Sequence, residues 1–120
     1  MTLTEFAQPA VRVAGFVVSM STEDAATVVT LRGEADLVTR PLVVDVLVRV
    51  IAGHDGPVVV DLAQTAFIDT GTVSALARAS QFLCDRERGL TLRSPSRAAV
   101  RQLTFVGLSN LVEPVGATDT

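Results

Sequence analysis

The chain has 120 residues, of which 48% are hydrophobic, so it is long and apolar enough to form one globular domain with a real core. Its formal net charge of −3 gives no general attraction to nucleic acid or to anionic membranes, and neither is an expected partner. All ten basic residues are arginine, and the lack of lysine excludes both a P-loop nucleotide site and a Schiff-base enzyme.

Reactive residue types are scarce. Cys84 is the only cysteine, which excludes an internal disulfide and favours a reducing compartment; its apolar helical surroundings suggest a core filler. His54 is the only histidine and lies in a Gly- and Pro-rich loop, so no Ser-His-Asp or Cys-His set can be assembled. We therefore expect no enzyme activity, no cofactor and no metal.

No segment of the sequence reads as a targeting or membrane signal. The N-terminus lacks the basic start and apolar run of a signal peptide. The most apolar stretch, residues 41–53, is interrupted by Asp45 and Arg49 and is too short to span a bilayer. The expected location is the cytoplasm, without membrane insertion.

The first third of the chain predicts an arm, a hairpin and a helix. Residues 1–14 show little periodicity and are expected to be a flexible arm. Two β-branched runs then predict a hairpin with strands at 16–20 and 27–32 and a turn over 21–26, ended by Gly33-Glu34-Ala35-Asp36. Thr39 as a cap, Pro41 just after it, and the spacing of Asp45 and Arg49 favour a helix up to Gly53.

The central stretch, residues 58–79, predicts a buried strand at Val58–Leu62, a polar connection through Phe67-Ile68, and a helix opening at Asp69 or Thr70. A carboxylate and a hydroxyl would then lie at a helix N-terminus, where unpaired N–H groups and the macrodipole favour negative charge. A phosphate on Thr70 would be well placed there. Both residues are also common helix caps, so this stretch alone leaves capping as the alternative.

The last third predicts a helix end, a strand and a further helix. Gly89 stops the central helix, and Leu90–Arg93 alternates as a strand. Ser94 and Ser96 are two candidate caps for a helix that ends at Gly107. Its apolar positions are Ala98, Ala99, Val100, Leu103 and Phe105. Residues 108–112 predict a short strand or turn, and residues 114–120 a frayed tail.

Strands that alternate with helices imply crossover connections and a mostly parallel sheet. The predicted fold class is α/β, with a mixed, mostly parallel sheet of four to five strands, helices packed on it, and a β-hairpin at its start. One domain over residues 15–113 would carry this fold.

Three segments, in this order and spacing, give the chain a resemblance to the STAS domain of bacterial anti-sigma factor antagonists over residues 16–112. Gly33-Glu34-Ala35-Asp36 is similar to that family's Gly-Glu-Leu-Asp. The strand at 58–62 followed by Phe67-Ile68-Asp69-Thr70 resembles its strand and Asp-Ser-Ser-Gly loop. Ser94-Pro95 opens the third helix in a familiar way. The resemblance thus implies a STAS-like fold.

The resemblance also implies a function. In that family, an anti-sigma factor with serine/threonine kinase activity phosphorylates the hydroxyl that follows the loop aspartate, and the unmodified antagonist binds this partner and releases the sigma factor. Here the matching acceptor is Thr70. The resemblance implies that the chain is a partner-switching phosphoprotein that acts in bacterial transcription regulation and stress response. Because Gly71-Thr72-Val73 replaces the usual Ser-Gly-Leu, Thr72 is the second-choice acceptor. The implied partner-binding residues are Asp36, Asp69, Thr70, Gly71, Thr72 and Ser94.

Other functions remain as alternatives at this point. STAS modules also pair with ATPase subunits of lipid-type ABC transporters, some with Asp-Thr-Gly in this loop, and there Thr70 would contact a partner without being phosphorylated. An acidic metal cluster of Asp36, Asp61 and Asp69, as in a phospho-relay receiver, fails because the chain lacks the lysine that receivers use. Homodimerisation through the last strand and tail stays open.

Overall fold

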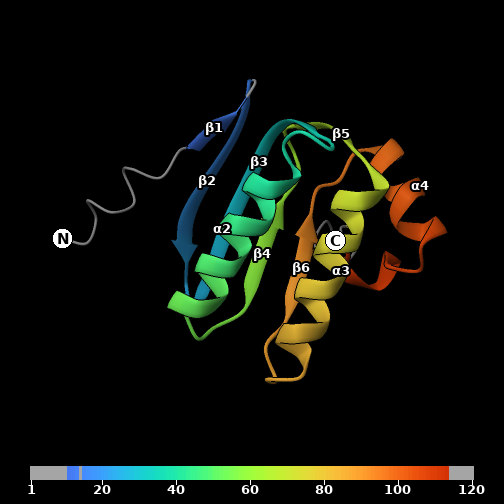
Figure 1. Cartoon of the computed structure of the whole chain (residues 1–120). Coiled ribbons are helices and arrows are strands. Elements are labelled where there is room, and N and C mark those ends of the chain that lie inside the picture. The colour runs from blue at the N-terminus through green and yellow to red at the C-terminus, as the bar shows by residue number, and fades with distance from the viewer. Residues whose placement is uncertain (1–10, 14, 114–120) are drawn as a thin grey trace.

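The computed structural model describes residues 11–13 and 15–113, which form one sheet with helices packed against it (Figure 1). The elements in chain order are β1 (Val11–Val13), β2 (Phe16–Glu23), β3 (Ala26–Ala35), α2 (Arg40–Gly53), β4 (Val58–Asp61), β5 (Thr65–Ile68), α3 (Thr70–Cys84), β6 (Leu90–Arg93), α4 (Arg97–Phe105) and a 3₁₀ turn, η1 (Ser109–Leu111).

The sheet has the order β1-β2-β3-β4-β6, and β5 pairs with β3. The first three strands are antiparallel, whereas β4, β5 and β6 are joined in parallel. Parallel neighbours need crossover connections, and α2 and α3 supply them. The fold class expected from the sequence is confirmed, but the sheet has six strands where four to five were expected, because β1 and β5 were not predicted.

Strand β3 pairs with two strands in turn. Its first part runs beside β4, from Thr27 to Thr30, and its last part runs beside β5. The register shifts between Gly33 and Glu34, and Gly33 has a φ of +113°, which side chains rarely tolerate. Because of this bulge, β3 stops pairing with β4 and pairs with β5 near its carboxyl end.

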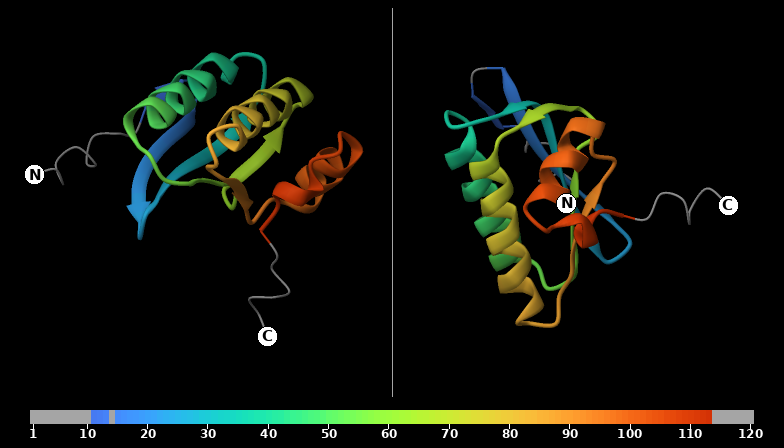
Figure 2. Two further views of the ribbon diagram at one scale, coloured as in Figure 1. Left: turned by 90° about the horizontal axis from the view of Figure 1, so that it is seen from below. Right: turned by 90° about the vertical axis from the view of Figure 1, so that its right-hand side faces the viewer.

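Helices α2 and α3 lie side by side on one face of the sheet, and α4 lies beyond β6 (Figure 2). Alternation along the strands produces this arrangement: Val58 and Val60 are buried, while Val59 and Asp61 between and after them are only partly so. The core is built from the apolar side chains of β2, β3, β4, β6 and the inner faces of the helices, with Phe16, Leu31, Leu76, Leu83 and Leu92 among its largest members.

Several sequence expectations need correction in the first part of the chain. Val11–Val13 forms a strand paired with β2, where an arm was expected; residues 1–10 and 14 lie outside the described residues. The hairpin turn is only Asp24-Ala25, because Asp24 takes a φ of +56° and closes a tight two-residue connection. Phe67-Ile68 belongs to strand β5, since β3 offers it an edge to pair with.

The later part of the chain also differs. Cys84 is exposed at the end of α3, so it is not a core filler. On α4, only Ala99 and Leu103 are buried, and Phe105 is 88% exposed, because this short helix touches the core along a narrow stripe. Residues 109–111 form a 3₁₀ turn, followed by a single bridge from Val112 to Leu92. The expected tail, 114–120, lies outside the described residues.

In the part of the chain that the structure describes, no helix combines the length and the apolar character needed to cross a membrane.

Candidate functional site

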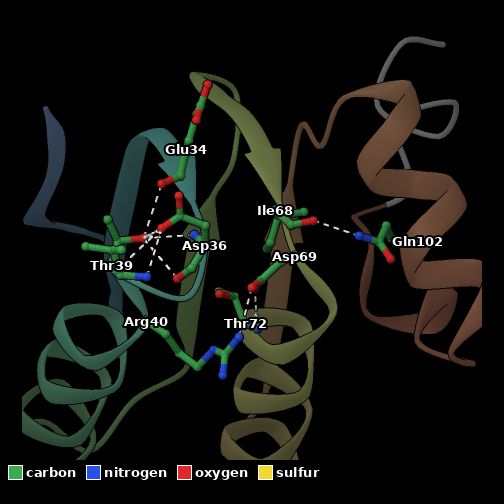
Figure 3. A network of polar contacts seen from close by, with 9 residues as sticks. Glu34, Asp36, Thr39, Arg40, Ile68, Asp69, Thr72 and Gln102 are labelled. Atoms are coloured by element: carbon green, nitrogen blue, oxygen red, sulfur yellow. Dashed lines mark hydrogen bonds and ion pairs between the residues drawn. The ribbon is translucent and has the colours of Figure 1, made fainter. Parts of the chain in front are cut away.

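All of the predicted site residues except Ser94 lie where β3 and β5 end and where α2 and α3 begin, and Figure 3 shows Asp36, Asp69 and Thr72 among them. The parallel pairing of β3 with β5 places their carboxyl ends together, and the N–H of Asp69 donates to the carbonyl of Ala35 at 2.9 Å. Asp36 and Asp69, 33 positions apart in the sequence, therefore follow neighbouring strands. The sheet register, rather than local sequence, brings the two motifs into one site.

Asp36 organises the turn into α2. Its Oδ1 accepts from the N–H groups of Val38 and Thr39, at 3.1 and 3.2 Å, and its own N–H donates to the hydroxyl of Thr39 at 2.9 Å. Thr39 is the residue before α2, yet its hydroxyl makes no capping bond to that helix. Its side chain holds the turn instead, which corrects the capping role expected from the sequence.

Asp69 is the N-cap of α3, which selects one of the two helix starts that the sequence allowed. Its Oδ1 accepts from the N–H of Thr72 at 2.8 Å, and its Oδ2 pairs with Nη2 of Arg40 at 2.8 Å. Partial burial alone would raise the pKa of Asp69, but the contacts from Thr72 and the hydrogen bond and charge of Arg40 outweigh it and hold that pKa below the ordinary aspartate value. Asp69 is therefore an ionised, tethered group.

Thr70 and Thr72 have opposite environments. Thr70 is the first residue of α3 and its side chain is exposed. Thr72 is fully buried, and its hydroxyl has no hydrogen-bond partner among the described residues. An enzyme can reach the hydroxyl of Thr70 but not that of Thr72, and this burial argues against Thr72 as a modification site.

Gly71 leaves room for a side chain from the other helix. A Cβ placed on Gly71 would overlap the guanidinium of Arg40, so glycine leaves the room that Arg40 needs to reach Asp69. The sequence reasoning did not single out Arg40. The available signal was a small residue beside the predicted cap, but its partner lies on another helix and cannot be identified from spacing.

Ser94 lies apart from the Asp36–Asp69 network. It is exposed at the end of β6, with a φ of +53°, and among residues 15–113 it makes no hydrogen bond to that network. The cap of α4 is Ser96, which accepts from the N–H of Ala99 at 3.1 Å. Helix α4 is joined to the site by Gln102, whose Nε2 donates to the carbonyl of Ile68 at 2.7 Å (Figure 3).

Three exposed apolar side chains lie at the same end of the molecule. Leu37 and Val38, in the turn after β3, are 70% and 64% exposed, and Phe67 on β5 is 50% exposed. These three side chains are candidates for contact with another protein. The sequence analysis missed them because an apolar pair between a strand and a helix reads as part of either element.

The arrangement offers an exposed hydroxyl, a capping carboxylate and an arginine, on a surface with apolar groups. Within residues 15–113 no cluster of three or more His, Cys, Asp or Glu side chains could hold a metal ion. The site therefore presents the hydroxyl of Thr70 at the surface, at a positively polarised helix end.

Comparison with known proteins identifies the domain type. A family model described as "Mlab, STAS domain" matches residues 18–113. The anti-sigma factor antagonist of Mycobacterium paratuberculosis superimposes with a TM-score of 0.76 at 24% identity, over 86% of this chain and 89% of that one. No curated protein matches the chain in sequence.

Two structures of SpoIIAA are also similar. The unphosphorylated anti-sigma factor antagonist SpoIIAA gives a TM-score of 0.72 at 15% identity, covering 85% of this chain and 92% of its own. The phosphorylated form, from Bacillus, gives 0.66 at 17% identity, covering 85% and 96%. At these identities the likeness establishes the fold.

Proposed function

The chain belongs to the STAS domain family, and from this premise we propose that it is an anti-sigma factor antagonist whose Thr70 is phosphorylated by an anti-sigma factor with serine/threonine kinase activity. Similar structures carry the name of anti-sigma factor antagonist, and one of them, SpoIIAA, is known in a phosphorylated form. In this role the chain acts in the cytoplasm and is a substrate and binding partner, without catalysis of its own.

The observation that carries the proposal is the exposure of Thr70 beside a fully buried Thr72. In the transfer, the Oγ1 of Thr70 forms a bond to the γ-phosphorus of ATP, ADP leaves, and the hydroxyl proton passes to a base of the kinase. The antagonist supplies only the hydroxyl, and Asp69 and the sheet register fix where it stands.

The unmodified surface would bind the partner through the exposed apolar groups of Leu37, Val38 and Phe67. A phosphate adds a charge of about −1.5 to −2 and must be dehydrated when the partner covers it. Because the positive charge of Arg40 lies beside Asp69 and offsets part of the negative charge that the phosphate adds, the cost falls mainly on docking. Phosphorylation would thus weaken binding by roughly 2–5 kcal/mol.

Two substitutions test the switch with purified anti-sigma factor and labelled ATP. Thr70→Ala should retain the fold and lose phosphate incorporation, whereas Thr72→Ala, a matched control, should keep it. Thr70→Glu should weaken binding of the partner, by less than phosphorylation does, since a carboxylate carries less charge. Full incorporation into Thr70→Ala would disprove Thr70 as the acceptor, and wild-type affinity of Thr70→Glu would disprove the electrostatic mechanism.

The sequence Asp69-Thr70-Gly71 also favours a second candidate, an accessory subunit that binds the ATPase of a lipid-type ABC transporter. Thr70 would then contact the ATPase without modification. A pull-down followed by mass spectrometry separates the two functions, because it reports both the partner captured and the state of Thr70.

A further inference from the structure

Arg40 reaches the first turn of α3 with most of its hydrogen-bonding capacity unused. A guanidinium offers five N–H donors, and the one hydrogen bond recorded for it among the described residues joins Nη2 to Asp69, at 2.8 Å. Its Nε is buried without a partner, as is the hydroxyl of Thr72 in the same turn. Among the described residues, the guanidinium therefore has donors left for a further acceptor.

The guanidinium contacts the residues on both sides of Thr70. It pairs with Asp69, and it fills the space where a Cβ of Gly71 would stand. Consecutive Cα atoms are about 3.8 Å apart, so a phosphate on Thr70 would lie within reach of Arg40 after a side-chain rotation. In addition, Thr70 and Gly71 are the first residues of α3, and their N–H groups have no carbonyl of the same helix to donate to.

We propose that Arg40 is the receptor for the phosphate on Thr70 and exchanges its ion pair with Asp69 for one with the phosphate. This inference rests on the proposed phosphorylation of Thr70. A phosphate brings three acceptor oxygens and about twice the charge of a carboxylate, and arginine binds it in bidentate fashion. Of the nearby carboxylates, Asp36 is engaged by Val38 and Thr39, which leaves Asp69 as the competitor.

The exchange changes the surface that a partner meets. Asp69 keeps its capping bond to Thr72 but loses its cationic neighbour, and Arg40 moves outward over the helix tip. Phosphorylation therefore alters the docking surface at Arg40 and Asp69 as well as at Thr70.

The test uses the full chain with phosphothreonine installed at position 70 during synthesis, so that no kinase is needed. A ³¹P NMR titration gives the second pKa of the phosphate, which is ordinarily about 6. In the Arg40→Gln variant we expect this pKa to lie roughly one unit higher than with Arg40 present. Arg49→Gln is the matched control, since it removes the same charge from the same helix at a site 71% exposed, and it should leave the titration unchanged.

Equal phosphate titrations with and without Arg40 would overturn the proposal. A second measurement needs no substitution: the NMR signal of the Arg40 Nε–Hε group in the otherwise wild-type chain should move on phosphorylation and titrate with the phosphate. An Arg40 signal that neither moves on phosphorylation nor titrates with the phosphate would also overturn the proposal. If the phosphate titrates independently of Arg40 while the anti-sigma factor still phosphorylates Thr70, only the role of Arg40 is refuted. If the phosphate and Arg40 titrate together but no anti-sigma factor phosphorylates Thr70, the proposed function is refuted instead.

Discussion

At the scale of single residues, two threonines in one helical turn differ in their exposure to solvent. Thr70 faces solvent and Thr72 is sealed in the interior without a hydrogen-bond partner among the described residues. A buried hydroxyl without a partner is destabilising, while an exposed one costs nothing. The two positions should therefore respond oppositely to substitution.

Thr72→Val should raise the free energy of unfolding by about 1 kcal/mol, because a methyl group of similar size replaces an unpaired buried hydroxyl. Urea denaturation measures this directly. Phosphorylation of Thr70 should persist in the variant. A loss of stability would show that the Thr72 hydroxyl does have an acceptor.

Asp69 gives the protein a pH-dependent contribution to stability. Its pKa is lower in the folded than in the unfolded chain, so protons bind the unfolded chain more readily. The stabilisation is fully present above the unfolded value of about 3.9 and is lost as the pH falls through the lowered folded value.

Asp69→Asn keeps a capping side chain but removes the charge that pairs with Arg40. At neutral pH the variant should unfold with about 1 kcal/mol less free energy than the wild type. This difference should shrink in denaturation curves taken below about pH 4. A difference that is constant with pH would mean that the ion pair contributes nothing.

At the scale of elements, the N-terminal turns of α2 and α3 are in contact through Arg40, whose guanidinium covers Gly71 and pairs with Asp69. The two helices begin 30 positions apart in the sequence and meet only because α2 and α3 lie side by side on the sheet. Glycine at the start of a helix is otherwise unfavourable compared with alanine. Its presence here is explained by the guanidinium that covers it.

A double-mutant cycle tests whether Arg40 and Gly71 are energetically coupled. In the Arg40→Ala background, Gly71→Ala should stabilise α3 by about 0.5 kcal/mol, because alanine is the better helix former. In the wild-type background the same change forces Arg40 away from Asp69, so the two effects should differ by about 1 kcal/mol. Equal effects in both backgrounds, measured by thermal unfolding, would mean that Arg40 does not depend on Gly71.

At the scale of the whole molecule, we place the docking surface at the end of the helix layer where α2 and α3 begin. Val38 precedes α2 beside the site, and Val48 lies about 12 Å along that helix, given a rise of 1.5 Å per residue. Their side chains are similarly exposed, at 64% and 58%.

Val38→Ser and Val48→Ser therefore form a matched pair. Val38→Ser should weaken binding of the anti-sigma factor at least tenfold if it lies in the centre of the interface, whereas Val48→Ser should bind like the wild type. Isothermal calorimetry measures both affinities, and circular dichroism checks the fold. Equal affinities of the two variants would place the docking surface elsewhere.

The sequence by itself determined the fold class and a helix start at Asp69 or Thr70, because these depend on local patterns: alternation in strands, apolar spacing in helices and capping chemistry. Thr70 as the acceptor follows from the family resemblance and stays a prediction. The spacing of Asp45 and Arg49 predicted the helix that carries them, and there the two side chains form an ion pair of 3.1 Å.

Only the tertiary structure decided the rest. Strand β5 exists because β3 extends past β4 and gives it an edge, and the burial of Thr72 depends on what packs over α3. The pairing of Arg40 with Asp69 joins residues 29 apart, and that of Arg93 with Glu23 joins residues 70 apart. Such contacts depend on sheet register and helix packing, which no local pattern encodes.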